Sequence, residues 1–151
     1  MVNQSQEKEK TILHEKPGLY LVSACLLGLR TRYDGELKPC EACRLKVKNN
    51  ALWIPVCPEQ LGGLPTPRPA ADIVGGDGYD VLAGRAAVVT REGEDVTARF
   101  LLGARQVLAI AMAQRITAVL LKSRSPSCGL TPRFGVTAAL LEQNGFVLQE
   151  F

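Results

Sequence analysis

The chain has 151 residues, of which 46% are hydrophobic, and a formal net charge of +3 at pH 7. This length predicts one domain that folds without disulfides, because a chain of this size buries about 68–70% of the surface that its unfolded form exposes. The Lys and Arg residues are scattered and do not indicate a nucleic-acid groove, and no apolar run approaches the length of a membrane span.

The first third of the chain predicts a tail, two strands and a short helix. Residues 1–16 lack an apolar block, so we expect a flexible tail without a secretory signal, followed by a cytoplasmic domain over residues 17–151. Residues 19–24 and 51–56 are short apolar runs that predict strands. Residues 39–49 predict a helix between them, with proline at the start and lysines near the end.

The rest of the chain alternates helices and strands after an extended excursion. Residues 71–90 contain a Gly-Gly-Asp-Gly turn signal and predict an excursion or hairpin beside the main sheet. Residues 95–114 predict the clearest amphipathic helix, and a strand, a helix and a last strand follow at residues 117–121, 135–143 and 146–151. This order predicts an α/β fold: a mostly parallel, Rossmann-like three-layer sheet flanked by helices, in a single domain.

Three of the five cysteines follow predicted strands: Cys25, Cys57 and Cys128. The carboxyl ends of strands in an open α/β sheet form one crevice, so these thiols are expected to converge there. Thiolates prefer iron-sulfur clusters, zinc or monovalent copper, and three of them leave one position free for a substrate. The alternative interpretation is three small buried hydrophobic side chains.

Several polar residues lie close in sequence to these cysteines. Glu59 and Asp34 are the nearest carboxylates, and either could act as a general base on water. Glu59 would also suit the first turn of a short helix, and Asp34 precedes a glycine in a strong turn signal. Lys122 and Ser123 open a loop, residues 122–129, whose cations and hydroxyls can bind an anion or hold a substrate carbonyl.

Cys40 and Cys43 form a separate Pro-Cys-x-x-Cys motif. This motif is half of the zinc deaminase signature, but the His-x-Glu half is missing. A thioredoxin-like redox pair is the next alternative, although the aromatic and Gly-Pro surroundings expected for it are absent. We therefore interpret the pair as incidental rather than as a metal or redox site.

Three longer motifs resemble the bacterial TudS-type thiouracil desulfidase family. They are Val-Ser-Ala-Cys-Leu-Leu-Gly with a following Arg-Tyr-Asp-Gly, then residues 55–68 around Cys57, and Leu-Lys-Ser-Arg-Ser-Pro-Ser-Cys-Gly around Cys128. The resemblance implies a 4Fe-4S cluster held by three protein ligands, Cys25, Cys57 and Cys128, with the fourth iron open to the sulfur of the substrate. It also implies catalytic roles for Glu59 and Ser125.

The implied reaction converts thiouracil and water into uracil and hydrogen sulfide without net redox change. Glu59 would deprotonate the water, and Ser125 would relay a proton or support the ring, with Asp34, Lys122 and Ser123 as candidate substrate-binding residues. The substrate would be a thiolated pyrimidine base, nucleoside or nucleotide, since the dedicated tRNA-binding domain of longer relatives is not expected here.

Two features depart from the family pattern. The segment between Cys128 and the predicted helix at residues 135–143 is shorter than in the family, which would open the pocket or shift substrate preference. Cys40 and Cys43 lie outside the three-ligand pattern. The alternatives to a desulfidase are a non-catalytic cluster- or zinc-bearing sensor, a sulfur carrier that uses the same thiols, or a structural zinc domain.

Overall fold

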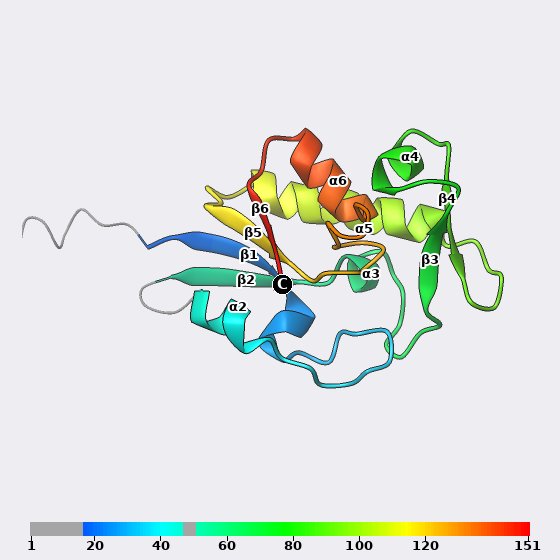
Figure 1. Cartoon of the computed structure of the whole chain (residues 1–151). Helices are drawn as coiled ribbons and strands as arrows, with labels where there is room; N and C mark the ends of the chain where they lie inside the picture. The colour runs from blue at the N-terminus through cyan, green and yellow to red at the C-terminus, as the bar shows by residue number, and fades with distance from the viewer. Residues whose placement is uncertain (1–16, 47–50) are drawn as a thin grey trace, which may run out of the picture.

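The main sheet has four parallel strands. A computed structural model describes residues 17–46 and 51–151, so the predicted tail at residues 1–16 lies outside the described part (Figure 1). The strands are β1 (Leu19–Ser23), β2 (Leu52–Val56), β5 (Ala118–Leu121) and β6 (Leu148–Glu150), in the spatial order β2-β1-β5-β6. The prediction of an α/β fold with a mostly parallel sheet is confirmed.

Alternate side chains of the central strands pack on opposite faces of this sheet, as the two-residue repeat of a strand requires. Leu21 and Val119 pack in one cluster with side chains of α5 (Thr97–Met112) and α6 (Val136–Gln143). Val22 and Leu120 pack on the other face with side chains of α2 (Glu41–Lys46) and the 3₁₀ helix η1 (Ala24–Leu27). Helices therefore cover both faces, and the apolar runs of the central strands β1 and β5 reflect burial on both sides, whereas the edge strand β2 exposes Leu52 and Trp53.

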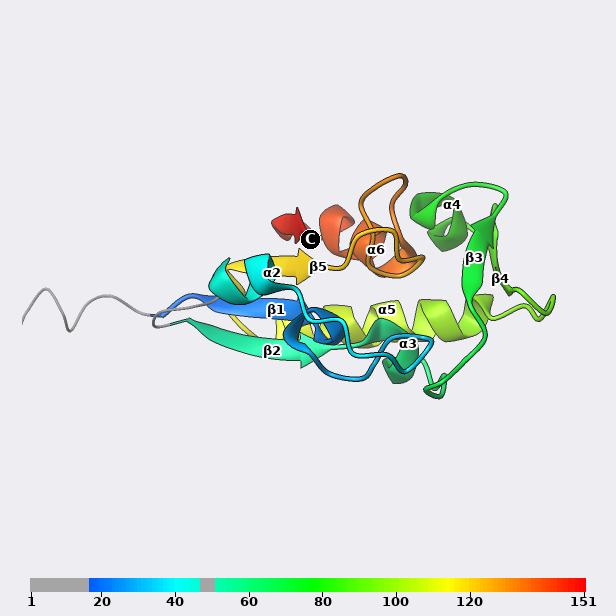
Figure 2. The same cartoon turned by 60° about the horizontal axis from the view of Figure 1, so that its bottom comes forward.

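A two-stranded antiparallel sheet stands apart from the main one. Both views show β3 (Ala71–Val74) and β4 (Ala87–Thr90) at one end of the molecule, beyond the main sheet (Figures 1 and 2). The predicted hairpin is confirmed, but the turn between its strands holds an unpredicted helix, α4 (Gly78–Leu82). Asp77 caps this helix by accepting the backbone amides of Tyr79 and Asp80, and the Asp80 side chain accepts the amide of Asp77.

The observed elements are shorter than predicted at several ends. The helix predicted over residues 39–49 begins at Glu41 and is described to Lys46, and residues 47–50 lie outside the described part. The long helix begins at Thr97, where the Asp95 carboxylate accepts the backbone amide of Thr97 at 2.9 Å. The strand predicted over residues 19–24 ends at Ser23, because Ala24 begins η1, which ends at Gly28 in the left-handed conformation with φ of 87°.

The short helix α3 (Pro58–Leu61) touches α5 backbone to backbone. A Cβ atom at Gly103 would collide with the carbonyl oxygen of Pro58, and one at Gly62 would collide with the carbonyl oxygen of Arg99. Only glycine allows this approach. The contact fixes α3, and with it Cys57 and Glu59, against the longest helix of the domain.

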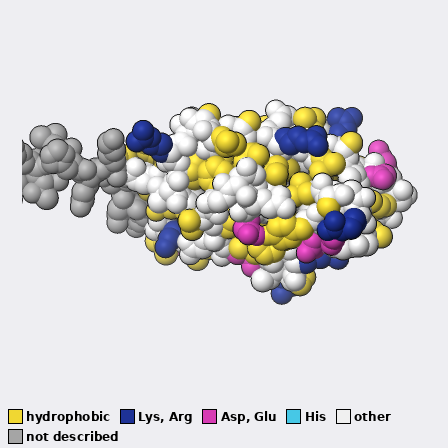
Figure 3. Space-filling view, turned by 90° about the horizontal axis from the view of Figure 1, so that it is seen from above, with side chains coloured by type: hydrophobic (Ala, Val, Ile, Leu, Met, Phe, Trp, Pro, Cys, Tyr) yellow, Lys and Arg dark blue, Asp and Glu magenta, His cyan; other side chains and the backbone are white. Residues whose placement is uncertain are grey.

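On the face that Figure 3 shows, Lys and Arg side chains lie at separate places. Within residues 17–46 and 51–151, no helix is both long and apolar enough to cross a membrane.

Candidate functional site

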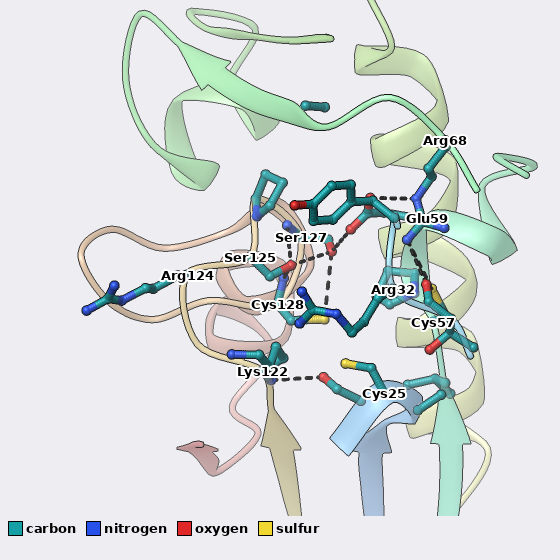
Figure 4. Close-up of a pocket in the computed structure, with 18 of the residues that line it drawn as sticks. Cys25, Arg32, Cys57, Glu59, Arg68, Lys122, Arg124, Ser125, Ser127 and Cys128 are labelled. Carbon is teal, nitrogen blue, oxygen red and sulfur yellow. Dashed lines mark hydrogen bonds and ion pairs between the residues drawn. The ribbon is translucent and has the colours of Figure 1, made fainter. Parts of the chain in front are cut away.

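Cys25, Cys57 and Cys128 lie around one cavity at the carboxyl end of the main sheet (Figure 4). Cys25 is in η1 after β1, Cys57 lies between β2 and α3, and Cys128 is in the loop after β5. Strand β1 pairs with both β2 and β5, so the ends of the three strands are adjacent. The cavity measures about 330 Å³, and the expected convergence of the three thiols is observed.

Burial keeps these thiols protonated when no metal is bound. Cys128 is only 4% exposed, and burial raises its pKa to about 12. Burial also raises the pKa of Cys57 and of Cys25, and for Cys25 the nearby Cys57 adds to the effect while Lys122 opposes it. A positively charged metal centre would reverse this preference, because it stabilises the thiolate.

The donor set at this cavity suits an iron-sulfur centre. Cys25, Cys57 and Cys128 are three soft donors around one shared cavity, and thiolates are the ligands that hold iron-sulfur clusters. In the part of the chain that the structure describes, no three His, Cys, Asp or Glu side chains form a group that could hold a single metal ion.

Glu59 is held at both carboxylate oxygens. It lies in the first turn of α3, where Arg68 donates from Nε to Oε1 at 3.0 Å and Ser127 donates from Oγ to Oε2 at 2.9 Å. The Arg68 side chain is only 4% exposed and also donates to the carbonyl oxygen of Thr31 at 2.8 Å. The same guanidinium lies 4.0 Å from the sulfur of Cys57. The carboxylate therefore has one defined position beside the thiols.

The loop at residues 122–129 is shaped by its own serines and by α6. The Ser125 hydroxyl accepts the backbone amides of Ser127 at 3.2 Å and of Cys128 at 3.0 Å, and it lies 3.0 Å from the Ser127 hydroxyl. At the start of α6, the amides of Val136 and Thr137 donate to carbonyl oxygens of the loop, each at 2.9 Å. These bonds fix Ser125 and Ser127 on the cavity wall.

The predicted substrate-binding residues divide into two groups. Lys122 and Ser123 line the cavity, and the Lys122 ammonium donates to the Ser123 hydroxyl at 3.2 Å. Asp34 is not among the lining residues: it pairs with Arg32 at 3.2 Å and accepts the amide of Glu36 at 3.0 Å. Asp34 thus reaches the cavity only through Arg32, which does line it.

Arg68 and Ser127 are site residues that the sequence analysis did not single out. Arg68 ends the Pro-rich motif that begins at residue 55, so the family resemblance contained it without indicating a partner. Ser127 is one of three serines at alternate positions before Cys128. The spacing alone does not tell which of these serines faces Glu59.

Cys40 and Cys43 do not line the cavity. Cys43 is fully buried among Val22, Leu26 and Leu120, and burial raises its pKa to about 11. Cys40 packs against the same cluster. This packing agrees with the interpretation that the pair is incidental to the site.

The short segment after Cys128 is tied to β6. The backbone amides of Leu130 and Thr131 and the hydroxyl of Thr131 all donate to the carboxylate of Glu150, at 2.6–2.8 Å. Burial opposes ionisation of Glu150, but these bonds outweigh it and lower the pKa of Glu150 below its usual value. The segment is thereby drawn toward the sheet.

Comparison with known proteins gives consistent matches over nearly the whole chain. The family described as 2-thiouracil desulfurase matches residues 20–150. The uncharacterized protein YbbK of Bacillus subtilis (strain 168) is 44% identical over 140 residues, which are 85% of this chain and 92% of YbbK. A solved structure, described as the 4Fe-4S-dependent thiouracil desulfidase TudS, superimposes with a TM-score of 0.70 and 38% identity, covering 88% of this chain and 90% of that one.

Proposed function

The chain belongs to the 2-thiouracil desulfurase family, and from this premise we propose that it is a 4Fe-4S-dependent desulfidase of thiolated pyrimidines. The observation that carries the proposal is the arrangement of three thiols and one fixed carboxylate around a single cavity. The reaction would convert thiouracil and water into uracil and hydrogen sulfide without net redox change.

Cys25, Cys57 and Cys128 would hold the cluster. When bound, the cluster supplies an iron without a protein ligand, which binds the thiocarbonyl sulfur and polarises the C=S bond. The three thiols must lose their protons to bind it, and Lys122 and Arg32, which oppose the rise in the pKa of Cys25, favour that loss.

Glu59 would act as the general base. The oxygen of the attacking water bonds to the thiocarbonyl carbon while one of its protons passes to the Glu59 carboxylate. The C–S bond then breaks, sulfur leaves with the bonding electrons, and two protons that came from water complete hydrogen sulfide. Arg68 and Ser127 hold the carboxylate in place during these steps.

The remaining polar groups would orient the substrate. A cavity of about 330 Å³ lies at the small end of the usual range for ligand pockets, and the cluster would fill part of it, so the remaining space suits no more than a single heteroaromatic ring. Lys122 and Ser123 offer donors on one wall, and Ser125 lies on the same loop. We propose that they receive the ring of a thiolated base, nucleoside or nucleotide.

The test is anaerobic preparation followed by metal analysis and turnover. We expect about four irons and four acid-labile sulfides per chain. We also expect sulfide and uracil to appear in equal amounts from 4-thiouracil. Fully loaded protein that binds 4-thiouracil without releasing sulfide would instead be a sensor or a sulfur carrier. Zinc without iron would indicate a structural zinc domain.

A further inference from the structure

Four side chains on the cavity wall form one continuous hydrogen-bonded chain. Arg68 bonds to Glu59 at 3.0 Å, Glu59 to Ser127 at 2.9 Å, and Ser127 to Ser125 at 3.0 Å (Figure 4). Arg68 and Ser127 are buried, whereas Ser125 is partly exposed and lines the cavity. The chain therefore connects a buried cation to the surface that would face the substrate.

Hydrogen-bonding capacity fixes the direction of this chain. The Ser125 hydroxyl oxygen already accepts two backbone amides, so both of its lone pairs are used and its own proton must be donated. The Ser127 hydroxyl lies within reach of it, and Ser127 in turn donates to the Glu59 carboxylate, which can only accept. In the resting state the protons point from Ser125 through Ser127 toward Glu59.

The Ser127 hydroxyl has one competing acceptor, the sulfur of Cys128, at 3.7 Å. A carboxylate oxygen at 2.9 Å is the better acceptor, because the bond is charge-assisted and shorter. Since Arg68 occupies the other carboxylate oxygen, the link between Ser127 and Glu59 does not depend on rotation of the carboxylate.

We propose that Ser127 is a positioning residue that joins Glu59 and Ser125 into one proton-transfer unit. The inference rests on the proposed function. As water attacks the thiocarbonyl carbon, Ser127 gives its proton to the Glu59 carboxylate, Ser125 gives its proton to Ser127, and Ser125 takes a proton from the water. Each hydroxyl again holds one proton, and Glu59 is protonated. Glu59, which also lines the cavity, then gives this proton to the departing sulfur and is again a carboxylate.

Replacement of Ser127 by alanine isolates this role, because only the hydroxyl is lost. The backbone amide of Ser127 still donates to Ser125, and its carbonyl oxygen still accepts the amides of Thr137 and Ala138. The loop and Cys128 should therefore keep their positions. Thr137→Val removes a buried hydroxyl at the start of α6 that does not line the cavity and has no hydrogen-bond partner among the described residues, and it serves as the matched control.

The experiment compares anaerobically loaded wild type, Ser127→Ala and Thr137→Val. For Ser127→Ala we expect kcat for 4-thiouracil to fall at least about 10-fold, within the range of general acid–base effects, with KM changed less than about 2-fold. The solvent deuterium isotope effect on kcat should rise, since proton transfer becomes slower. The absorption spectrum and the reduction potential of the cluster should stay unchanged, because the hydroxyl donates to Glu59 at 2.9 Å in preference to the sulfur of Cys128 at 3.7 Å.

Two results would overturn the inference while leaving the proposed function intact. One is a wild type that releases sulfide together with a Ser127→Ala variant of equal kcat, or a Thr137→Val variant that is just as slow as Ser127→Ala. The other is a shifted absorption spectrum or reduction potential of the cluster in Ser127→Ala, which would show that the Ser127 hydroxyl donates to the sulfur of Cys128 rather than to Glu59. A loaded wild type that releases no sulfide would instead refute the proposed function itself, and the inference with it.

A double variant adds an independent check. When two residues serve one proton-transfer path, removal of either breaks the path, so their effects on kcat do not multiply. The kcat of the double variant Ser125→Ala/Ser127→Ala should therefore be no lower than that of the slower single variant. Losses in kcat that multiply would show two separate roles, and the proposed unit would then be wrong.

Discussion

Replacement of Arg68 by methionine should destabilise the protein even without a cofactor. Methionine has a similar reach but no charge and no donor. The Arg68 side chain is 4% exposed and that of Glu59 is 14% exposed, so the ion pair between them is largely screened from water. The same guanidinium donates to the carbonyl oxygens of Thr31 at 2.8 Å and Pro65 at 3.2 Å. All of these bonds are lost at once.

Removal of one partner from a buried ion pair costs about 3–5 kcal/mol. Glu59 keeps its bond from Ser127 and some contact with water, which favours the lower end of this range. Each carbonyl oxygen that loses its hydrogen bond from Arg68 adds about 1–3 kcal/mol to this cost. Contributions of neighbouring groups to the free energy of unfolding are not additive, so the total is smaller than their sum. We therefore expect Arg68→Met to lower the free energy of unfolding by about 3–4 kcal/mol and Tm by about 10 °C.

The assay is urea denaturation of reduced, cofactor-free protein, followed by far-UV circular dichroism. The matched control is the double variant with Glu59→Gln, which should recover part of the loss because no unpaired charge is then buried. A loss below about 1 kcal/mol for Arg68→Met, or no recovery in the double variant, would refute the argument that this pair is buried and coupled.

The remaining predictions concern the ligands, the base and the loop after Cys128. Replacement of Cys25, Cys57 or Cys128 by serine should abolish cluster loading, as measured by iron and acid-labile sulfide. Glu59→Gln should keep the cluster absorbance but lower kcat by a factor of about 10²–10⁴. Glu150→Gln should lower stability by about 1–2 kcal/mol at neutral pH. Because the pKa of Glu150 is lowered on folding, this difference should be present above the ordinary carboxyl pKa and disappear as the pH falls through the lowered value.

Each of these predictions has a result that contradicts it. A serine variant with full iron content would remove that cysteine from the ligand set, and Cys40→Ser, a thiol outside the cavity, is the control that should load normally. Full desulfidase activity of the Glu59→Gln variant would show that Glu59 is not the general base. A Glu150→Gln effect that persists unchanged in acid would mean that its hydrogen bonds do not depend on ionisation.

The strands and the convergence of the thiols were predictable because they follow from local pattern. The central strands β1 and β5 are covered on both faces and are therefore apolar, and the edge strand β2 is also an apolar run although Leu52 and Trp53 are exposed, so all three were visible in the sequence. Once the strands are parallel neighbours, residues that follow them must meet at one edge. Cys25, Cys57 and Cys128 needed no further information to be placed together.

The partners of Glu59 were not predictable in this way. Arg68 reaches Glu59 because the chain turns back after α3 through a Pro-rich stretch with no periodicity. Ser127 faces Glu59, and Ser125 does not, because Ser125 accepts two amides of its own turn while the start of α6 holds the loop from behind. Both outcomes depend on contacts between distant elements, which single-sequence patterns do not record.

The backbone contact between α3 and α5 limits how this enzyme could be re-engineered. A single methyl group at Gly103 or Gly62 would push α3 away from α5 and carry Cys57 and Glu59 with it, while Cys25 in η1 and Cys128 in the loop after β5 stayed in place. Mutant libraries designed to admit larger thiolated rings should therefore vary the wall at residues 122–125 and keep both glycines constant. Neither glycine lines the cavity, yet loss of either would move a cluster ligand and the base away from the other two thiols.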